Sequence, residues 1–289
     1  MKKIIAVLLS ALMVGAAVTS LPLSAGAASV EQGAVDTVGT PTVIDGFHIV
    51  WNGDNYGEIV KYTGDAVNLT IPQTIGGYEI NEIGSQAFSG NDTLNSVVIP
   101  SGIEEIGYRA FSQCSALKSV VIESRVNTLD EGIFYGCENL ESVTIPEGIT
   151  EITDNMFYDC YSLKSINLPS SITSIGTAAF MSCLSLESIV IPNGVQRIED
   201  STFYLCCDLS SVSIPSTVSY IGESAFLSCV KLKNVTLSSS LTEIGRDAFN
   251  YCTALKSIIL PKSLKKSVAV HFTAAKTLKP SPAAVRLNT

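Results

Sequence analysis

The sequence predicts an α/β repeat solenoid, and three observations carry this prediction. A 23-residue unit repeats without insertion or deletion from Tyr78 to Pro261, the hydrophobic spacing changes within each unit, and a proline closes most units. A fixed period of 20 to 50 residues is typical of solenoids. One phenylalanine marks each unit, at Phe88, Phe111, Phe134, Phe157, Phe180, Phe203, Phe226 and Phe249.

The first half of each unit is predicted to form a short helical turn. In the second unit the apolar residues from Ala110 to Leu117 fall at relative positions 0, 1, 4 and 7. This spacing places side chains on one face of a helix. A further apolar pair, such as Ile172 and Ile175, turns the chain back, and a glycine such as Gly176 often follows it. We expect this glycine to permit a tight or left-handed backbone.

The second half of each unit is predicted to be a short strand. Leu117, Val120 and Ile122 follow the rhythm L-x-x-L-x-L, whose V-x-I part alternates as in a strand with one buried face. Proline ends the strand in most units because it lacks an N–H and cannot extend the ladder. Stacked units should form a right-handed coil with a parallel β-sheet on the concave face and short helical turns on the convex side.

The repeat motif resembles a known family. I-G-x-x-A-F-x-x-C followed by L-x-x-[VI]-x-[IL]-P is similar to the BspA-like, LRR_5-type subfamily of bacterial leucine-rich repeats, with departures at Asn91, Asp130, Thr153 and Glu199. The resemblance implies a secreted or surface-displayed interaction module, associated with adhesion to host matrix proteins or other cells. The resemblance does not by itself imply an activity or a named ligand.

The chain is expected to divide into four parts. Residues 1–27 have the features of a signal peptide: Lys2 and Lys3, an apolar stretch and a small-residue cleavage site. No later apolar run reaches the roughly 20 residues of a transmembrane helix. The other three parts are an N-terminal linker and β-rich cap, the solenoid of eight units, and a degenerate repeat with a basic tail, at residues 28–77, 78–261 and 262–289.

Charge is distributed unevenly along the chain. All 27 acidic residues lie within residues 28–261 together with ten basic ones, so this body carries −17, whereas residues 262–289 hold six cations and no acid. An acidic body argues against nucleic acid, which is bound by clustered cations. The basic tail is either a solvated terminus or an electrostatic attachment to an anionic cell wall. From the signal-like segment at residues 1–27 we expect a secreted protein, and we expect it to be monomeric.

Seven of the eight cysteines form a column at the repeat interval. They are Cys114, Cys137, Cys160, Cys183, Cys206, Cys229 and Cys252, and Cys207 is the extra one. Stacked residues about 4.8 Å apart exceed the usual Cβ separation of a disulfide, about 3.8 Å. We expect buried free thiols, with some bridging as the alternative. A file of single thiols without histidine is no tetrahedral metal site.

The outward strand positions are the first candidate for ligand contact. Two columns supply the candidates: Lys118, Glu141, Lys164 and Glu187 in a charged column, and Val121, Thr144, Asn167 and Val190 in a small column. The alternating signs predict cross-strand ion pairs. This face either contacts an extracellular protein, such as a host matrix or cell-surface protein, or merely keeps the solenoid solvated.

A second candidate lies on the predicted helical side. Tyr135, Tyr158 and Tyr204 occupy one repeat position and could stack on the sugar rings of a glycan, anchor a protein partner, or only shield the solenoid. Catalysis has little support, because His48 and His271 are far apart and no known catalytic motif is present. We predict no catalytic residue, no metal site and no cofactor.

Overall fold

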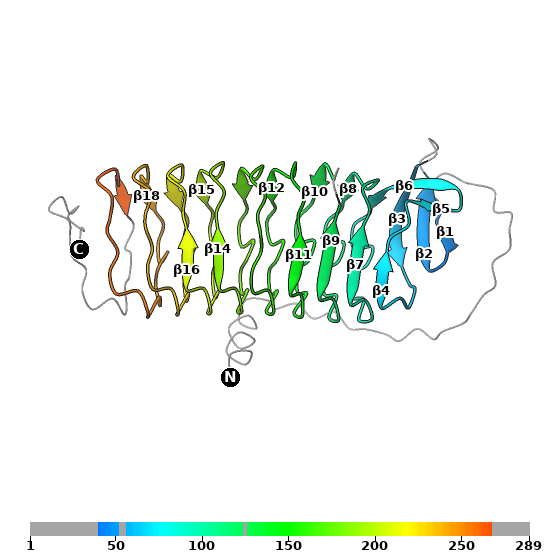
Figure 1. Ribbon diagram of the computed structural model, residues 1–289, viewed down its shortest axis with the longest axis horizontal. Helices are drawn as coiled ribbons and strands as arrows, with labels where there is room; N and C mark the ends of the chain where they lie inside the picture. The colour runs from blue at the N-terminus through cyan, green and yellow to red at the C-terminus, as the bar shows by residue number, and fades with distance from the viewer. Residues whose placement is uncertain (1–39, 52–55, 124–125, 268–289) are drawn as a thin grey trace.

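The computed structural model describes residues 40–51, 56–123 and 126–267. The predicted signal peptide and most of the basic tail lie outside these residues. Coils stack in a nearly straight row in the view of Figure 1, with the N-terminal cap at one end and the last unit at the other. The described residues form nineteen strands and no helix, so the molecule is a β-solenoid rather than the α/β solenoid predicted.

An antiparallel cap begins the row. β1 (Thr42–Ile44) pairs with β2 (Phe47–Trp51), which pairs with β3 (Tyr56–Tyr62). β3 then runs parallel to β6 (Tyr78–Ile83), and β5 (Thr74–Ile75) forms a hairpin with β6. The cap covers the first coil because Trp51 and Tyr62 are buried and pack, with tilted rings, against Tyr78 and Phe88 respectively.

The V-x-I segments form the strand face, which we define as the outward side of six parallel strands. Their inward residues are buried, apart from partly buried Leu69 of the first strand, and their outward ones are accessible, as expected of a sheet with one buried side. From β7 onward each pairing between described strands joins residues 23 apart, as Ser96 pairs with Ser119. The strands are β4 (Asn68–Thr70), β7 (Ser96–Ile99), β9 (Ser119–Ile122), β11 (Ser142–Thr144), β14 (Ser188–Val190) and β16 (Ser211–Ser213).

A second set of parallel strands forms the narrow face, with two residues from each coil. From β8 to β18 the inward residue of each strand, such as Ile106 or Ile152, is buried in the core. Figure 1 shows these strands in a row above the strand face. They are β8 (Glu105–Ile106), β10 (Thr128–Leu129), β12 (Glu151–Ile152), β13 (Ser174–Ile175), β15 (Arg197–Ile198), β17 (Tyr220–Ile221), β18 (Glu243–Ile244) and β19 (Lys266–Ser267).

The predicted helical turns are wrong, and consecutive β-turns replace them along what we call the turn edge. Two residues per coil, four apart, have positive φ and break any helix. They are Gln86 and Gly90, Arg109 and Gln113, Gly132 and Gly136, Asn155 and Asp159, Ala178 and Ser182, Ser201 and Leu205, Ser224 and Ser228, and Asp247 and Tyr251.

Hydrogen bonds explain why turns replace a helix. Alternate amides of the turn edge donate to the next coil, as the Phe88 amide does to the Ala110 carbonyl at 2.8 Å. The amides between them donate three residues back, as Ala87 does to Gly84 at 3.2 Å. Inter-coil bonding therefore takes amides that an α-helix would use internally. The spacing 0, 1, 4 and 7 fits both conformations.

The core is a continuous spine of stacked phenylalanines. Every repeat phenylalanine from Phe88 to Phe249 is at most 1% exposed. Neighbouring ring centroids are 4.7 to 5.9 Å apart with interplanar angles of 4° to 24°. These rings join the coils into one hydrophobic core.

The glycine that follows the second apolar residue of the narrow-face strand permits close approach of neighbouring coils. None of these glycines, Gly84, Gly107, Gly176, Gly222 and Gly245, has the left-handed backbone that we expected as one possibility. A Cβ added at Gly245 would lie 2.4 Å from the Glu223 nitrogen of the previous coil. Ring spacing follows the residue at this position. The phenylalanine ring centroids of two consecutive coils lie 4.7 to 5.3 Å apart where the later coil has glycine at this position. They lie 5.5 to 5.9 Å apart where the later coil has Asp130, Thr153 or Glu199.

None of the eight cysteines forms a disulfide. The seven in the column are buried, and each thiol donates a hydrogen bond to a phenylalanine carbonyl of the preceding coil, as Cys114 Sγ does to Phe88 O at 3.1 Å. Asn91 holds the cysteine position in the first coil. Its Oδ1 accepts instead from the amides of Thr93 and Leu94. The column is thus a hydrogen-bonded part of the core.

Candidate functional site

The strand face displays both predicted columns to solvent. Its eight candidates, Lys118, Val121, Glu141, Thr144, Lys164, Asn167, Glu187 and Val190, are all exposed. Val190 is 68% exposed, high for a large aliphatic side chain. The neighbouring coils bring these residues into parallel files, as Val121 pairs with Thr144 in the sheet register. The face is therefore a flat, accessible array.

The ion pairs expected along the charged column are missing from the described residues. Ion pairs there join Arg197 to Glu199, Lys231 to Asp208 and Arg246 to Glu223, at 2.7, 3.1 and 3.3 Å. None involves the charged column. Exposed pairs contribute little, about 0 to 1 kcal/mol, so solvation of separate charges competes well. The lysines and glutamates of this face remain available to a partner.

A third column on the strand face was missed in the sequence analysis. Serine begins the strand segment in seven of eight coils: Ser96, Ser119, Ser142, Ser165, Ser188, Ser211 and Ser257, with Asn234 in the remaining coil. Identity at one repeat position was the signal that could have found it. These hydroxyls lie at half-buried or exposed positions, and Ser96 donates to Asn68 at 2.7 Å. The serine column adds hydrogen-bonding groups between the charged and small columns.

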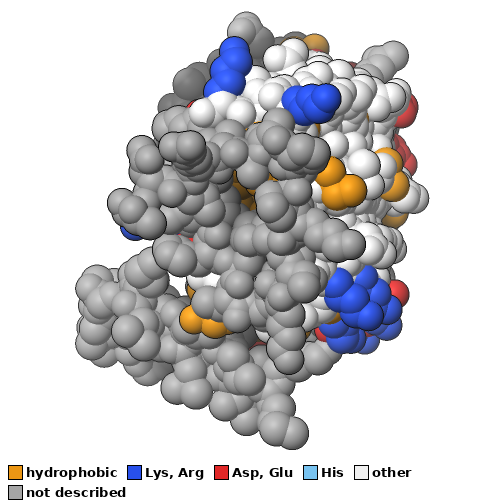
Figure 2. Space-filling model, turned by 90° about the vertical axis from the view of Figure 1, so that its left-hand side faces the viewer, with side chains coloured by type: hydrophobic (Ala, Val, Ile, Leu, Met, Phe, Trp, Pro, Cys, Tyr) orange, Lys and Arg blue, Asp and Glu red, His pale blue; other side chains and the backbone are white. Residues whose placement is uncertain are grey.

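Charge on the strand face differs from that of the whole body. The charged column continues through Ser210 to Lys233 and Lys256, so it holds four lysines and two glutamates. The excess of acid therefore lies on other surfaces. Figure 2 looks along the row from the C-terminal end and shows Lys and Arg side chains in separate groups at the rim, with small hydrophobic patches between them.

The tyrosine file lies on the turn edge and is half-buried. Tyr135 and Tyr158 stack on each other with centroids 4.7 Å apart, and the Arg109 guanidinium carbon lies 4.3 Å from the Tyr135 centroid. Both faces of the Tyr135 ring are thus covered. Tyr204 packs against a small cluster of Tyr161, Leu184 and Leu205. The file presents ring edges and hydroxyls more than ring faces.

One carboxyl beside this file has a perturbed pKa. Burial raises the pKa of Asp159 to about 6, against hydrogen bonds from Ser182 and Tyr161 that lower it. Burial and the charge of Asp159 raise the pKa of Tyr158 to about 12. The Asp159 Oδ1 atom is buried and without a hydrogen-bond partner. This carboxyl contributes to the pH dependence of stability.

Catalytic and metal chemistry find no assembled site in the part of the chain that the structure describes. His48 lies in the cap, where its Nε2 is 3.1 Å from Thr63 Oγ1, and His271 lies outside the described residues. No group of three His, Cys, Asp or Glu side chains there could hold a metal ion. Nor do these residues include a helix long and apolar enough to cross a membrane.

The coils and their motif define a leucine-rich-repeat protein. The model of the BspA type leucine rich repeat region matches six copies over residues 61–187 and 173–279. The chain belongs to this family, as its repeat motif predicts.

Solved structures include similar solenoids. A leucine rich repeat protein of T. pallidum is 28% identical, with a TM-score of 0.53 over 75% of this chain and 91% of that one. A leucine rich cell surface protein of Faecalibacterium prausnitzii is also 28% identical, with a TM-score of 0.41 over 84% of this chain and 88% of that one. A comparison with curated proteins gave no significant match.

Proposed function

We propose that this protein is a secreted, non-catalytic binding module whose strand face holds an extracellular protein in adhesion or attachment. One observation carries the proposal. Eight coils present exposed charged, hydroxyl and small apolar side chains in regular files, and the charged column is not consumed by ion pairs within the described residues. A flat face of mixed polarity suits a protein surface better than a small molecule, which usually needs a concave site.

Residues at the middle of the row should dominate binding. Lys164 and Glu187 lie on adjacent coils, and the exposed residue Val190 follows Glu187 on the same strand face. Interface energy concentrates near the centre of a contact, where side chains become fully desolvated. The serine column supplies donors and acceptors that a partner can satisfy directly or through water.

The experiment is a binding screen of the mature protein against immobilised host matrix proteins and a glycan array. Once the screen gives a matrix protein that binds, the double substitution Lys164→Ala/Glu187→Ala in the solenoid should weaken the affinity for it at least fivefold without changing the net charge. The matched control is Glu223→Ala/Arg246→Ala, which removes an exposed ion pair on the turn edge. Equal effects of the two double substitutions would remove the strand face as the contact surface.

The secreted location and the cell-wall role of the basic tail belong to the same proposal. The signal-like segment 1–27 and the cations of residues 262–289 support them. Carbohydrate recognition by the tyrosine file has less support, because Tyr135 and Tyr158 cover each other's ring faces. Sugar stacking requires an open ring face.

A further inference from the structure

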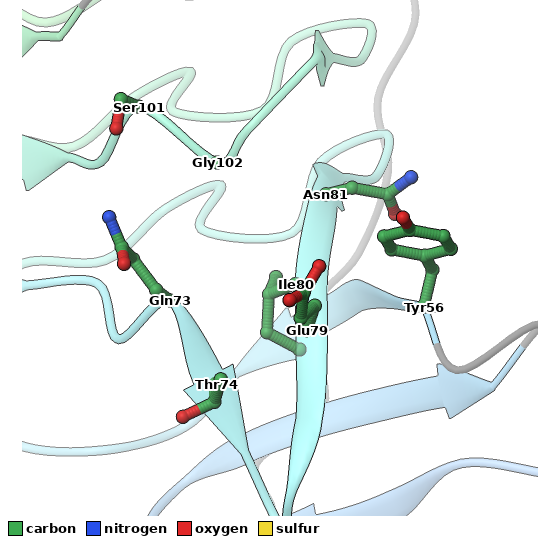
Figure 3. A pocket seen from close by; sticks show the side chains of 8 residues that line it. All are labelled: Tyr56, Gln73, Thr74, Glu79, Ile80, Asn81, Ser101 and Gly102. Carbon is green, nitrogen blue, oxygen red and sulfur yellow. The ribbon is translucent and has the colours of Figure 1, made fainter.

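A polar pocket of about 250 Å³ lies where the cap meets the first coil, away from the strand-face candidates. Its lining is Tyr56, Gln73, Thr74, Glu79, Ile80, Asn81, Ser101 and Gly102. Figure 3 shows Glu79 near the centre, with Gln73 and Thr74 on one side and Tyr56 and Asn81 on the other. One carboxylate thus lies among neutral carboxamides and hydroxyls.

The strand register builds the pocket. Glu79 pairs with Thr74 across the β5–β6 hairpin and with Tyr56 across the β3–β6 ladder, which places the three residues in one row. The hairpin closes through Gly76 and Gly77, both at positive φ, as a two-residue turn of this kind requires. The floor of the pocket is therefore held by two sets of backbone pairings.

Asn81, which lies at a β-bulge in β6, adds a second polar side chain of this strand to the pocket. The β3–β6 pairing joins Gly57 to Ile80 and then Glu58 to Glu82, so it passes over Asn81. Asn81 lies two residues after Glu79, so strand alternation places both side chains on the outward side of β6, and the bulge leaves Glu82 accessible as well. The backbone carbonyl of Asn81 accepts a hydrogen bond from the Glu104 amide at 2.7 Å, which holds this part of β6 against the next coil. Asn81 consequently lines the pocket beside Glu79.

The electrostatic surroundings of the pocket favour a cation. Glu58, Glu82 and Glu105 stand in register on three adjacent strands, next to pocket residues of β3 and β6. Burial, and then the charge of Glu105, raise the pKa of Glu58, and burial with the charges of Glu58 and Glu105 raises the pKa of Glu82. Carboxylates that repel one another create a negative potential, which a bound cation relieves.

We propose that this pocket binds the guanidinium of an arginine side chain from a basic peptide ligand. The Glu79 carboxylate accepts hydrogen bonds from the planar fork, and the side-chain oxygens of Gln73, Asn81 and Ser101 are placed to accept others. The volume falls below the 300 to 1,000 Å³ usual for small-molecule sites, which suits one long side chain. This binding is independent of the strand face.

The test is a titration of the mature protein with N-acetyl-arginine N-methylamide, followed by two-dimensional NMR of backbone amides. We expect saturable shifts confined to the amides of the pocket, and at least fivefold weaker binding of the citrulline analogue, which has the same shape without the charge. Glu79→Gln should weaken arginine binding at least fivefold. Glu141→Gln, an equal charge change on the strand face, should leave it unchanged.

The proposal fails if the citrulline analogue binds as tightly as arginine, if Glu79→Gln binds normally, or if the shifts spread over the acidic residues of the whole body. Glu79 is exposed, so its amide variant should fold. The double variant Lys164→Ala/Glu187→Ala should bind the arginine probe like the wild type. Loss of one site therefore does not register as loss of the other.

Discussion

Replacing Gly222 by alanine should force two coils apart. A Cβ at this position would meet Asp200 Oδ1, the Asp200 nitrogen at 2.6 Å and the Glu199 carbonyl carbon at 2.7 Å. Two of these three atoms belong to backbone, which cannot rotate away. The backbone angle is not the obstacle, because Gly222 is not among the residues with positive φ.

The structure sets the size of the effect. Ordinary carbon contacts begin near 3.5 Å, so the coils must separate by several tenths of an ångström at this interface. Phe203 and Phe226 are 5.2 Å apart there, whereas Phe111 and Phe134 are 5.9 Å apart where Asp130 replaces glycine. The fold therefore accepts wider spacing, but only with loss of packing. We expect Gly222→Ala to lower the free energy of unfolding by about 1 to 3 kcal/mol.

Urea unfolding of the mature protein, followed by circular dichroism and fluorescence together, measures this loss. Coincidence of the two signals tests whether a single free energy is meaningful for the stacked coils. The matched control is Asp130→Ala, at the same repeat position in a coil that already has a side chain. It removes one hydrogen bond to the Glu131 amide and should cost less than about 1 kcal/mol.

A result in which both variants lose the same stability would refute the reasoning. So would Gly222→Ala at wild-type stability, because the contacts of 2.6 and 2.7 Å leave no room for an added methyl. In either case, glycine at this repeat position would not determine coil spacing.

Other predictions concern thiols, pH and the spine. In the native protein a thiol reagent should modify half-buried Cys207 first, and the cysteine column only after unfolding. The reason is that burial raises the pKa of the column thiols, for example that of Cys252 to about 12. Rapid reaction of the column in the native protein would contradict its burial. Asp159, with a folded pKa of about 6 above its usual ~3.9, should make stability fall as pH rises from ~4 to ~6. Asp159→Asn should flatten that slope in melting temperatures, and an unchanged slope would assign it to other groups. Phe157→Ala should lower the free energy of unfolding in urea by about 3 to 5 kcal/mol. Phe249→Ala should lower it by about 1 kcal/mol less, because Phe249 stacks on one described ring and Phe157 on two. Equal losses would exclude a stacking contribution.

Much of the fold is predictable from the repeat itself. A 23-residue period requires equivalent residues to stack, so the phenylalanine spine, the buried cysteine column and the 23-residue strand register follow from counting. The exposed strand-face columns follow by the same logic, since V-x-I alternation turns intervening residues outward. The serine column was equally accessible in the sequence.

The conformation of the turn edge was not predictable from spacing. Apolar positions at 0, 1, 4 and 7 suit a helix and also a pair of β-turns. The choice depends on amides such as that of Phe88 bonding to the neighbouring coil, a contact between residues 22 apart. The absence of ion pairs in the charged column likewise depends on side-chain positions in three dimensions, among the residues that the structure describes.

The sequence by itself determined the period, the family, the inward core and the residues of the strand face, because each is a property of the repeat and recurs in every coil. Only the tertiary structure decided the helix-free turn edge, the covered tyrosine rings and the pocket around Glu79. These depend on one coil packing on the next, and the pocket further needs the β5–β6 hairpin of the cap, where Tyr56, Glu79 and Gly102 come together from separate segments.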